Sequence, residues 1–133
     1  FVTISLWIKK SSDSGILVKK YKDRNGFKIE IINNKIKFNT AGVSNTDTGI
    51  VCNTELSGDW NHIVVTAKKV EESKQKIYLN GNLCNTNDAS PNTLNNEDAN
   101  MFIGTNFIGK IDELKIWDKE LTAEQVGLLY SSY

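Results

Sequence analysis

The stretch from residue 60 to residue 85, WNHIVVTAKKVEESKQKIYLNGNLCN, constrains the fold more than any other part of the chain. Its first part alternates apolar with other side chains at a period of two, which is the pattern of a half-buried strand. A charged run at 68–76 interrupts this pattern before residues 77–79 begin a return strand. Asn80-Gly81 then predicts a two-residue type I′ turn, because both positions need positive φ. The stretch therefore predicts a three-stranded antiparallel meander with a solvated loop at 68–76.

The register of the second turn bears on the two cysteines. Across this turn Tyr78 should face Leu83 and Ile77 should face Cys84, which directs Cys84 toward the core. Cys52 and Cys84 lie too far apart for a CxxC motif, so they form either a structural disulfide or two buried thiols. A disulfide requires the two Cα atoms to lie within about 7 Å.

A second hairpin can be read almost residue by residue. Residues 27–32 and 35–39 flank Asn33-Asn34, and a type I′ turn there brings apolar residues opposite apolar ones and a carboxylate opposite an ammonium group. The expected pairs are Ile31 with Ile36, Ile29 with Phe38, and Glu30 with Lys37.

The remaining segments read as short strands separated by polar turns. In residues 1–9 the even-numbered apolar residues should face the core and Trp7 the other side of the sheet. Further strands are expected at 15–18, 48–56, 101–103 and 107–117, with polar segments at 19–26, 41–49 and 85–100.

The last element is the only helix expected. Thr122 and Gln125 form a capping box, Leu121 and Val126 can pack across it, and Val126, Leu129, Tyr130 and Tyr133 share one helical stripe. Many short strands with regular turn signals predict an all-β fold, a two-sheet antiparallel sandwich closed by one short C-terminal helix.

Composition excludes several classes of protein. The 133 residues suit a single domain, and the formal net charge of zero gives no basic surface for nucleic acid. The longest apolar runs are strand-sized, so no transmembrane segment is expected. Because residue 1 already belongs to a strand pattern, we expect a piece of a larger protein.

Four segments in this order resemble the laminin-G-like branch of the concanavalin A-like lectin/glucanase superfamily. They are VTISLWI at 2–8, WNHIVVT at 60–66, IYLNG at 77–81, and GKIDELKIW with LTAEQV at 109–126. The chain is also similar to the lectin-like half of clostridial neurotoxin receptor-binding regions. The resemblance implies a jelly-roll sandwich and a further N-terminal strand region that this sequence does not contain. Either a sheet edge is then exposed, or the missing strands come from elsewhere in the parent protein.

Enzymatic chemistry is not expected. Glycosidases of the superfamily carry paired carboxylates at fixed short spacing, and no Glu-x-Asp-x-x-Glu pattern occurs. Asp112 and Glu113 are adjacent in a strand and should point to opposite faces. His62 has no nucleophile in a recognisable local motif and reads as a packed strand histidine.

Several side chains could bind a ligand, and each also has a purely structural explanation. Trp7, Tyr78 and Trp117 could stack on sugars, although strand aromatics more often pack. Loop amides and carboxylates could bind sugar hydroxyls or serve only as solvated turn formers, and three of them, Asp47, Asp88 and Asp98, could bind calcium if their loops meet. The candidate ligand-binding residues are Asn45, Asp47, Asp88, Asn96, Asp98, Asn106 and Tyr78.

These features predict a non-catalytic recognition module of a secreted or surface multidomain protein. Carbohydrate binding is the first expectation, with a glycan held at a rim formed by residues 41–49, 85–100 and 105–106. Adhesion to a cell-surface protein is the alternative. A third possibility is a structural accessory domain beside a catalytic or toxin domain of the same polypeptide.

Overall fold

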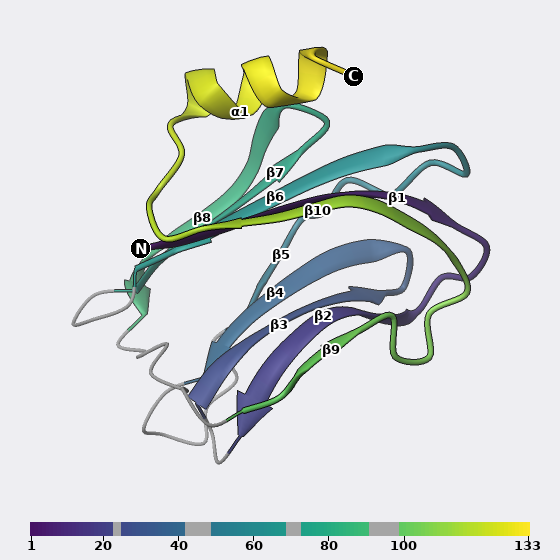
Figure 1. Ribbon diagram of the computed structural model, residues 1–133, viewed down its shortest axis with the longest axis horizontal. Coiled ribbons are helices and arrows are strands. Elements are labelled where there is room, and N and C mark those ends of the chain that lie inside the picture. The colour runs from purple at the N-terminus through teal and green to yellow at the C-terminus, as the bar shows by residue number, and fades with distance from the viewer. Residues whose placement is uncertain (23–24, 42–48, 69–72, 91–98) are drawn as a thin grey trace.

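Two antiparallel sheets of five strands each face one another in this protein (Figure 1). The computed structural model describes residues 1–22, 25–41, 49–68, 73–90 and 99–133, with the side chains at 25, 41, 73, 74 and 88–90 left out of the description. The elements are β1 (Val2–Lys10), β2 (Gly15–Lys22), β3 (Asn25–Ile32), β4 (Lys35–Ala41), β5 (Ile50–Val51), β6 (Asn61–Ala67), β7 (Ser73–Leu79), β8 (Asn82–Ser90), β9 (Met101–Ile103), β10 (Gly109–Trp117) and α1 (Ala123–Ser131). Sheet A has the order β10-β1-β6-β7-β8, and sheet B has the order β5-β4-β3-β2-β9. The predicted two-sheet sandwich with one short helix is confirmed.

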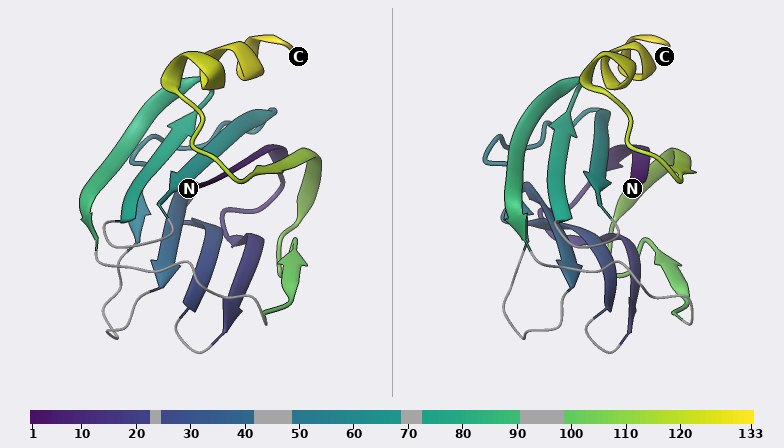
Figure 2. Two further views of the ribbon diagram at one scale, coloured as in Figure 1. Left: turned by 60° about the vertical axis from the view of Figure 1, so that its left-hand side comes forward. Right: turned by 90° about the vertical axis from the view of Figure 1, so that its left-hand side faces the viewer.

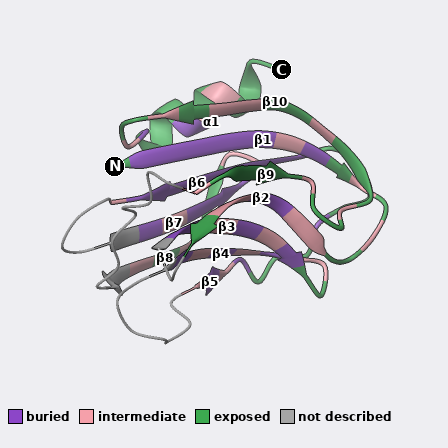
Figure 3. Ribbon diagram, turned by 60° about the horizontal axis from the view of Figure 1, so that its bottom comes forward, coloured by how far each residue is buried: buried purple, intermediate pink, exposed green. Residues whose placement is uncertain are grey.

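Strand β6 is the centre of sheet A. Every residue of β6 is buried, because β1 and β7 flank it, sheet B covers one face and residues around α1 cover the other. Figure 3 shows the burial concentrated on β1 and β6, whereas β9 and β10 are largely exposed. The predicted meander of β6, β7 and β8 is thus confirmed, and the stretch that carries it lies at the middle of the sheet.

The core lies between the sheets and follows the predicted alternation. Val2, Ile4, Leu6 and Ile8 of β1 all face sheet B and are buried. The opposite face of β1 is covered as well, since Thr3 and Ser5 are buried despite being polar. Sheet A therefore packs on both faces, and the cover on the outer face comes from the C-terminal part of the chain.

Both tight turns have the backbone that their residues predicted. Asn33 and Asn34 have φ of 50° and 64°, and Asn80 and Gly81 have φ of 50° and 85°. All three predicted pairs across the first turn occur, Ile31 with Ile36, Ile29 with Phe38, and Glu30 with Lys37.

The predicted register of the second hairpin is confirmed in part. Tyr78 lies opposite Leu83 as predicted, but Ile77 lies opposite Asn85, because a bulge makes Cys84 the extra residue. Cys84 still packs against the core from its half-buried position and forms a disulfide with Cys52, with 5.4 Å between the Cα atoms. The disulfide alternative is therefore the one realised.

Several strand limits differ from those predicted. Strand β2 continues through the polar residues up to Lys22, and β7 begins at Ser73 within the run predicted as a solvated loop. Gln75 of that run is fully buried, and its amide donates a hydrogen bond to Thr40 of sheet B. Within the described part of the predicted strand 48–56, residues 49–56, only β5 is a strand, whereas residues 85–90, predicted as irregular, belong to β8. In β2, β7 and β8, hydrogen bonding to a neighbouring strand extends the strand through polar residues that local sequence alone assigns to loops.

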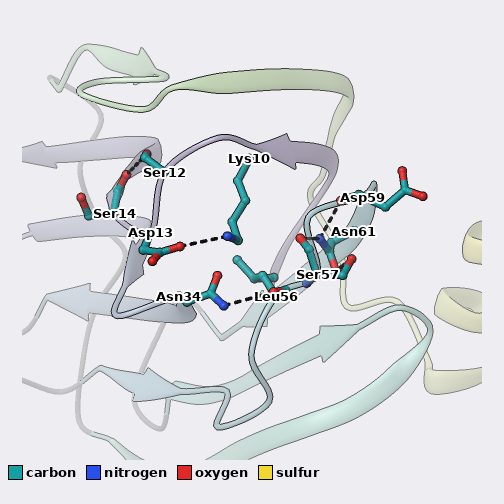
Figure 4. A network of polar contacts seen from close by, with 9 residues as sticks. All are labelled: Lys10, Ser12, Asp13, Ser14, Asn34, Leu56, Ser57, Asp59 and Asn61. Atoms are coloured by element: carbon teal, nitrogen blue, oxygen red, sulfur yellow. Dashed lines mark hydrogen bonds and ion pairs between the residues drawn. The ribbon is translucent and has the colours of Figure 1, made fainter.

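Turns from both sheets meet at one end of the sandwich in a polar network (Figure 4). The Asn34 amide donates to the Asp13 carbonyl at 3.0 Å and its side chain donates to the Leu56 carbonyl at 3.1 Å. The buried Asn61 side chain donates to the Ser57 carbonyl at 3.0 Å. These bonds tie the β1–β2 and β3–β4 turns to the segment that leads into β6.

The edge strands of the two sheets lie along the two long sides of the sandwich (Figure 2). On one side, the Cys52–Cys84 disulfide and a 2.8 Å bond from Asn85 Nδ2 to the Val51 carbonyl join β5 to β8. On the other side lie the edge strands β9 and β10. Ile103 pairs with the core residue Val18 and Ile116 with the core residue Ile4, so both point inward, yet they are 54% and 46% exposed. Apolar side chains of the two edge strands are therefore partly exposed along this second side, while their core partners Ile4 and Val18 stay buried.

Candidate functional site

The chain segment that precedes α1 is fastened to the outer face of sheet A. The buried Thr3 hydroxyl donates to the Lys119 carbonyl at 2.6 Å and accepts from the Leu121 amide at 3.1 Å. Lys76 adds an ion pair with Glu120 at 3.0 Å. Thr3 lies more than a hundred positions before its partners in the sequence. These contacts therefore fix the place on sheet A from which the helix starts.

Helix α1 begins as the sequence predicted. The Thr122 side chain accepts from the Gln125 amide, and the Gln125 side chain accepts from the Thr122 amide, which completes the capping box. Val126 is buried in a small cluster on the outer face of sheet A, together with Val64 and Tyr78. The first turns of α1 are thus anchored by apolar packing, while its last turn extends over β1 and β6.

Aromatic rings gather beneath that last turn. The Trp7 ring lies 4.8 Å from the His62 ring, 5.6 Å from the Tyr130 ring and 5.7 Å from the Tyr133 ring, measured between centroids. Tyr130 stacks on both Trp7 and His62 at an interplanar angle of 24°. Tyr130 is 37% exposed and Tyr133 is 55% exposed, so these two rings are the most exposed of the four.

Charged groups border the exposed tyrosine. Lys115 Nζ donates to the Tyr133 hydroxyl at 2.6 Å and lies 5.2 Å from the centre of its ring. The same hydroxyl donates to Glu113 Oε2 at 3.0 Å, and Lys115 pairs with that oxygen at 3.6 Å. A cation, a hydroxyl and a carboxylate therefore lie side by side at the edge of an aromatic surface.

We call this group the aromatic–charged cluster. Its members come from β1, β6, β10 and α1 with the residues just after it, and they are Trp7, His62, Glu113, Lys115, Tyr130 and Tyr133.

Burial sets the electrostatics of the cluster. Desolvation by burial and, to a smaller extent, the nearby Lys115 charge together lower the pKa of His62 from 6.5 to about 4. The hydrogen bond with Tyr133 raises the pKa of Lys115, and Glu113 adds to that effect. At neutral pH the imidazole is uncharged and the ammonium group is charged, so Glu113 and Lys115 together leave the cluster with no net charge.

Two ring nitrogens in the cluster are buried without a hydrogen-bond partner among the described residues. They are Trp7 Nε1 and His62 Nδ1. A buried polar atom without a partner costs about 1–3 kcal/mol. These two nitrogens therefore reduce the stability that packing of the Trp7 and His62 rings contributes.

The cluster has the chemistry of a recognition surface. Exposed aromatic faces take up the C–H face of a ring-shaped ligand, and the adjacent carboxylate, hydroxyl and ammonium groups offer hydrogen bonds of both senses. No group of three or more His, Cys, Asp or Glu side chains that could hold a metal ion occurs among the described residues.

The residues predicted from the sequence are not brought together in the described structure. Asn45, Asp47, Asn96 and Asp98 lie outside the described residues, and Asp88 belongs to β8 with its side chain likewise undescribed. Calcium binding by Asp47, Asp88 and Asp98 therefore stays a prediction.

Asn106 does not lie where the predicted rim requires it. It is exposed and follows Thr105, whose carbonyl accepts from the Ile16 amide at the start of β2. Ala41, the last described residue before the 42–48 gap, pairs with Gly26, which in turn pairs with Tyr21 near the end of β2. Asn106 and Ala41 therefore lie near opposite ends of β2. The reason is that β9 runs antiparallel to β2, so the turn that follows β9 lies beside the first residues of β2.

Tyr78 is a packing residue. It is 2% exposed and belongs to the apolar cluster beneath α1, because the helix covers the face of β7 from which it projects. The prediction that Tyr78 contacts a ligand is wrong for this reason. Trp7 and Trp117 are half-buried, and Trp117 packs against the same apolar cluster.

The predicted orientation of Asp112 and Glu113 on opposite faces is also wrong. The pairing of β1 with β10 shifts between Ser5, opposite Lys115, and Trp7, opposite Asp112, which leaves an extra residue in β10. Glu113 has φ of 52°, and its carboxylate reaches Tyr133 and Lys115 on the outer face, where Asp112 pairs with Trp7. A bulge, which a strict period of two does not describe, causes the difference.

The aromatic–charged cluster was not predicted. The sequence placed Tyr130 and Tyr133 on a helical stripe and Trp7 on the outer face of its strand. Only the crossing of α1 over β1 and β6 brings these rings to one place. An outward-facing tryptophan and a tyrosine-bearing helix stripe were the two signals from which the cluster could have been inferred.

The two antiparallel sheets and the C-terminal helix have the arrangement of a concanavalin A-like jelly-roll sandwich. A family model described as "Concanavalin A-like lectin/glucanases superfamily" matches residues 2–127, and the chain belongs to this family. No curated protein matches the sequence. Within the described residues no helix is long and apolar enough to span a membrane.

Similar solved structures are receptor-binding domains of botulinum neurotoxins. The type G receptor-binding domain shares 20% sequence identity with this chain, and the TM-score is 0.79. The matched region covers 98% of this chain and 38% of the neurotoxin chain. The type DC binding domain, solved with rat synaptotagmin II and also with SialylT, shares 21% identity with a TM-score of 0.76, at 98% and 35% coverage. The chain thus spans about a third of the length of these structures, and the likeness concerns the fold.

Proposed function

We propose that this domain is a non-catalytic module that recognises glycans through the aromatic–charged cluster. The observation that carries the proposal is the pair of solvent-exposed tyrosine rings, Tyr130 and Tyr133, beside the Lys115 and Glu113 side chains. Apolar faces for stacking next to paired donors and acceptors match a sugar ring, which has both kinds of surface. The similarity to binding domains that were solved with SialylT and with a protein supports a recognition role.

The disulfide supports a place outside the reducing cytosol. Cys52 and Cys84 are the only cysteines, and such bonds persist mainly in secreted and surface proteins. We therefore expect the module to belong to a secreted or surface protein, with glycans or cell-surface proteins as its partners.

A glycan array with fluorescently labelled protein tests the proposal. The array should contain neutral and sialylated oligosaccharides and be read both with calcium and with EDTA. We expect defined glycan hits for the wild type and a loss of at least about tenfold in affinity, near 1.4 kcal/mol, for Tyr133→Ala. Tyr21→Ala is the matched control, because Tyr21 is 40% exposed on sheet B, away from the cluster.

The predicted rim supplies a competing location. A triple variant Asp47→Ala, Asp98→Ala, Asn106→Ala should leave binding unchanged if the cluster is the site. If that variant loses binding while Tyr133→Ala keeps it, the ligand sits at the rim. A silent array together with binding to a cell-surface protein would favour adhesion instead.

A second candidate function is packing against a neighbouring part of the same polypeptide. The inward-facing but exposed Ile103 and Ile116, with Ile108 at 64% exposure, favour it, since a strand added beside β10 would bury them. The further N-terminal strand region expected from the family resemblance could provide that cover. Hydrogen exchange checks this, because β10 amides should be better protected in the longer protein than in this chain alone. Equal exchange rates would exclude it.

A further inference from the structure

Glu113 has a backbone conformation that its residue type does not favour. Among the described residues, the other non-glycine positions with positive φ are all asparagines, the residue type that tolerates this region best, and they lie outside the regular strands. Glu113 has φ of 52° within β10. A glycine would adopt the same backbone without the steric penalty of a Cβ atom.

The bulge aims the Glu113 side chain. Asp112 pairs with Trp7 and Lys115 with Ser5, so Glu113 and Leu114 together span the place of one residue on β1. Leu114 packs toward the core, while the Glu113 carboxylate joins Lys115 and Tyr133. The Glu113 amide is satisfied locally by the Asp112 carboxylate at 2.8 Å. Bulges that re-aim one side chain are typical of strands beside functional sites.

Visible contacts do not explain why a glutamate occupies this position. Its ion pair with Lys115 spans 3.6 Å between side chains that are 43% and 41% exposed, and its bond to Tyr133 is also at the surface. Exposed pairs of this kind add little to stability. The unfavourable φ therefore outweighs or cancels what these contacts contribute, and folding alone would be served better by glycine.

We propose that Glu113 is the specificity-determining residue of the aromatic–charged cluster and that it selects uncharged sugars. This inference rests on the proposed function. A carboxylate accepts hydrogen bonds from two neighbouring hydroxyl groups, while the exposed Tyr133 ring lies within reach of the sugar face. Because Glu113 already neutralises Lys115, the ammonium group does not attract the carboxylate of an acidic sugar, and sialylated termini are disfavoured.

Two substitutions at position 113 separate stability from recognition. Glu113→Gly should raise the melting temperature by several degrees and weaken binding to neutral glycans by tenfold or more. Glu113→Gln keeps the side-chain shape but frees Lys115, so neutral glycans should bind about tenfold more weakly and sialylated ones more strongly than to the wild type. Glu30→Gln is the control away from the cluster, because Glu30 forms an ion pair with Lys28 at 3.1 Å on sheet B, between side chains less exposed than those of Glu113 and Lys115.

The outcomes distinguish this inference from the proposed function. If Tyr133→Ala abolishes neutral-glycan binding but both position-113 variants bind like the wild type, the site stands and the role of Glu113 is wrong. A Glu113→Gly protein less stable than the wild type would show that folding retains the glutamate, which also overturns the inference. Stronger wild-type binding to sialylated than to neutral glycans contradicts the assigned ligand class while leaving glycan recognition intact. A wild type that binds no glycan overturns the proposed function.

Discussion

At the scale of single residues, His62 links the aromatic–charged cluster to pH. It is the only histidine, it is 1% exposed, and burial lowers its pKa from 6.5 to about 4. Between these two values the unfolded chain binds more protons than the folded one. The free energy of unfolding therefore decreases as pH falls from about 6.5 to about 4. The decrease is up to about 3 kcal/mol, because each unit of pKa difference corresponds to about 1.4 kcal/mol.

His62→Phe tests this dependence, because phenylalanine retains a ring beside Trp7 and Tyr130 but does not titrate. Urea unfolding followed by tryptophan fluorescence at pH 7 and pH 4.5 should show a smaller loss of stability in the variant than in the wild type. Carboxylates titrate in both proteins, so the difference between the two isolates His62. Identical losses would show that the imidazole is not buried in its neutral form.

Gly81 couples the β7–β8 turn to the cluster. Its φ is 85°, and a Cβ atom there would lie 2.9 Å from Tyr130 Cδ1. Gly81→Ala should cost about 1–2 kcal/mol and displace Tyr130. Gly58→Ala is the control, since no atom lies within 4 Å of its added Cβ. Thermal unfolding measures the cost, and equal melting temperatures for the two variants would contradict the assigned turn geometry.

At the scale of elements, α1 is short and depends on its cap. Thr122→Ala removes the side chain that accepts the Gln125 amide and should destabilise the protein by about 1 kcal/mol. Gly127→Ala should act in the opposite direction by about 0.5–1 kcal/mol, because Gly127 is helical and its added Cβ meets no neighbouring atom within 4 Å. The double variant should return near the wild-type melting temperature. A neutral Thr122→Ala would show that packing of Val126 alone holds the helix.

Element limits were predictable where both local signals and burial agreed. The two Asn-containing turns and the capping box have the geometry read from their residues. The short extent of β5 within the predicted strand 48–56 and the early start of β7 were not predicted, because pairing with a neighbouring strand decides how far a strand extends. Gln75 illustrates this, since its burial depends on Thr40 in the other sheet.

At the scale of the whole molecule, the disulfide closes one side of the sandwich. Cys52 and Cys84 are 32 positions apart. A disulfide across this separation restricts the unfolded chain, and the lost entropy of that chain stabilises the folded state by about 3–4 kcal/mol. Reduction, or the double variant Cys52→Ala, Cys84→Ala, should lower the free energy of unfolding by that order. Urea titrations with and without reductant measure it, and the double variant should not respond to reductant. A wild type equally indifferent to reductant would contradict the bond.

The amino-acid sequence by itself determined the class of fold. Apolar alternation, two Asn-rich turns and a capping box are local signals, and each acts through residues that are near one another in the chain. The antiparallel sandwich, the central position of the 60–85 stretch and the terminal helix follow from them. The family resemblance rests on the same segments.

Only the tertiary structure decided the candidate site. The cluster joins residues from β1, β6, β10 and the C-terminal end, and its members meet because Thr3 and Val126 fix the path of α1 across sheet A. The orientation of Glu113 depends on a bulge that arises from the pairing of two strands. The sequence indicates which faces of β1 and α1 carry the rings, but not that these faces meet. Contacts between distant segments bring the side chains together, and the period of a single strand or helix does not encode such contacts.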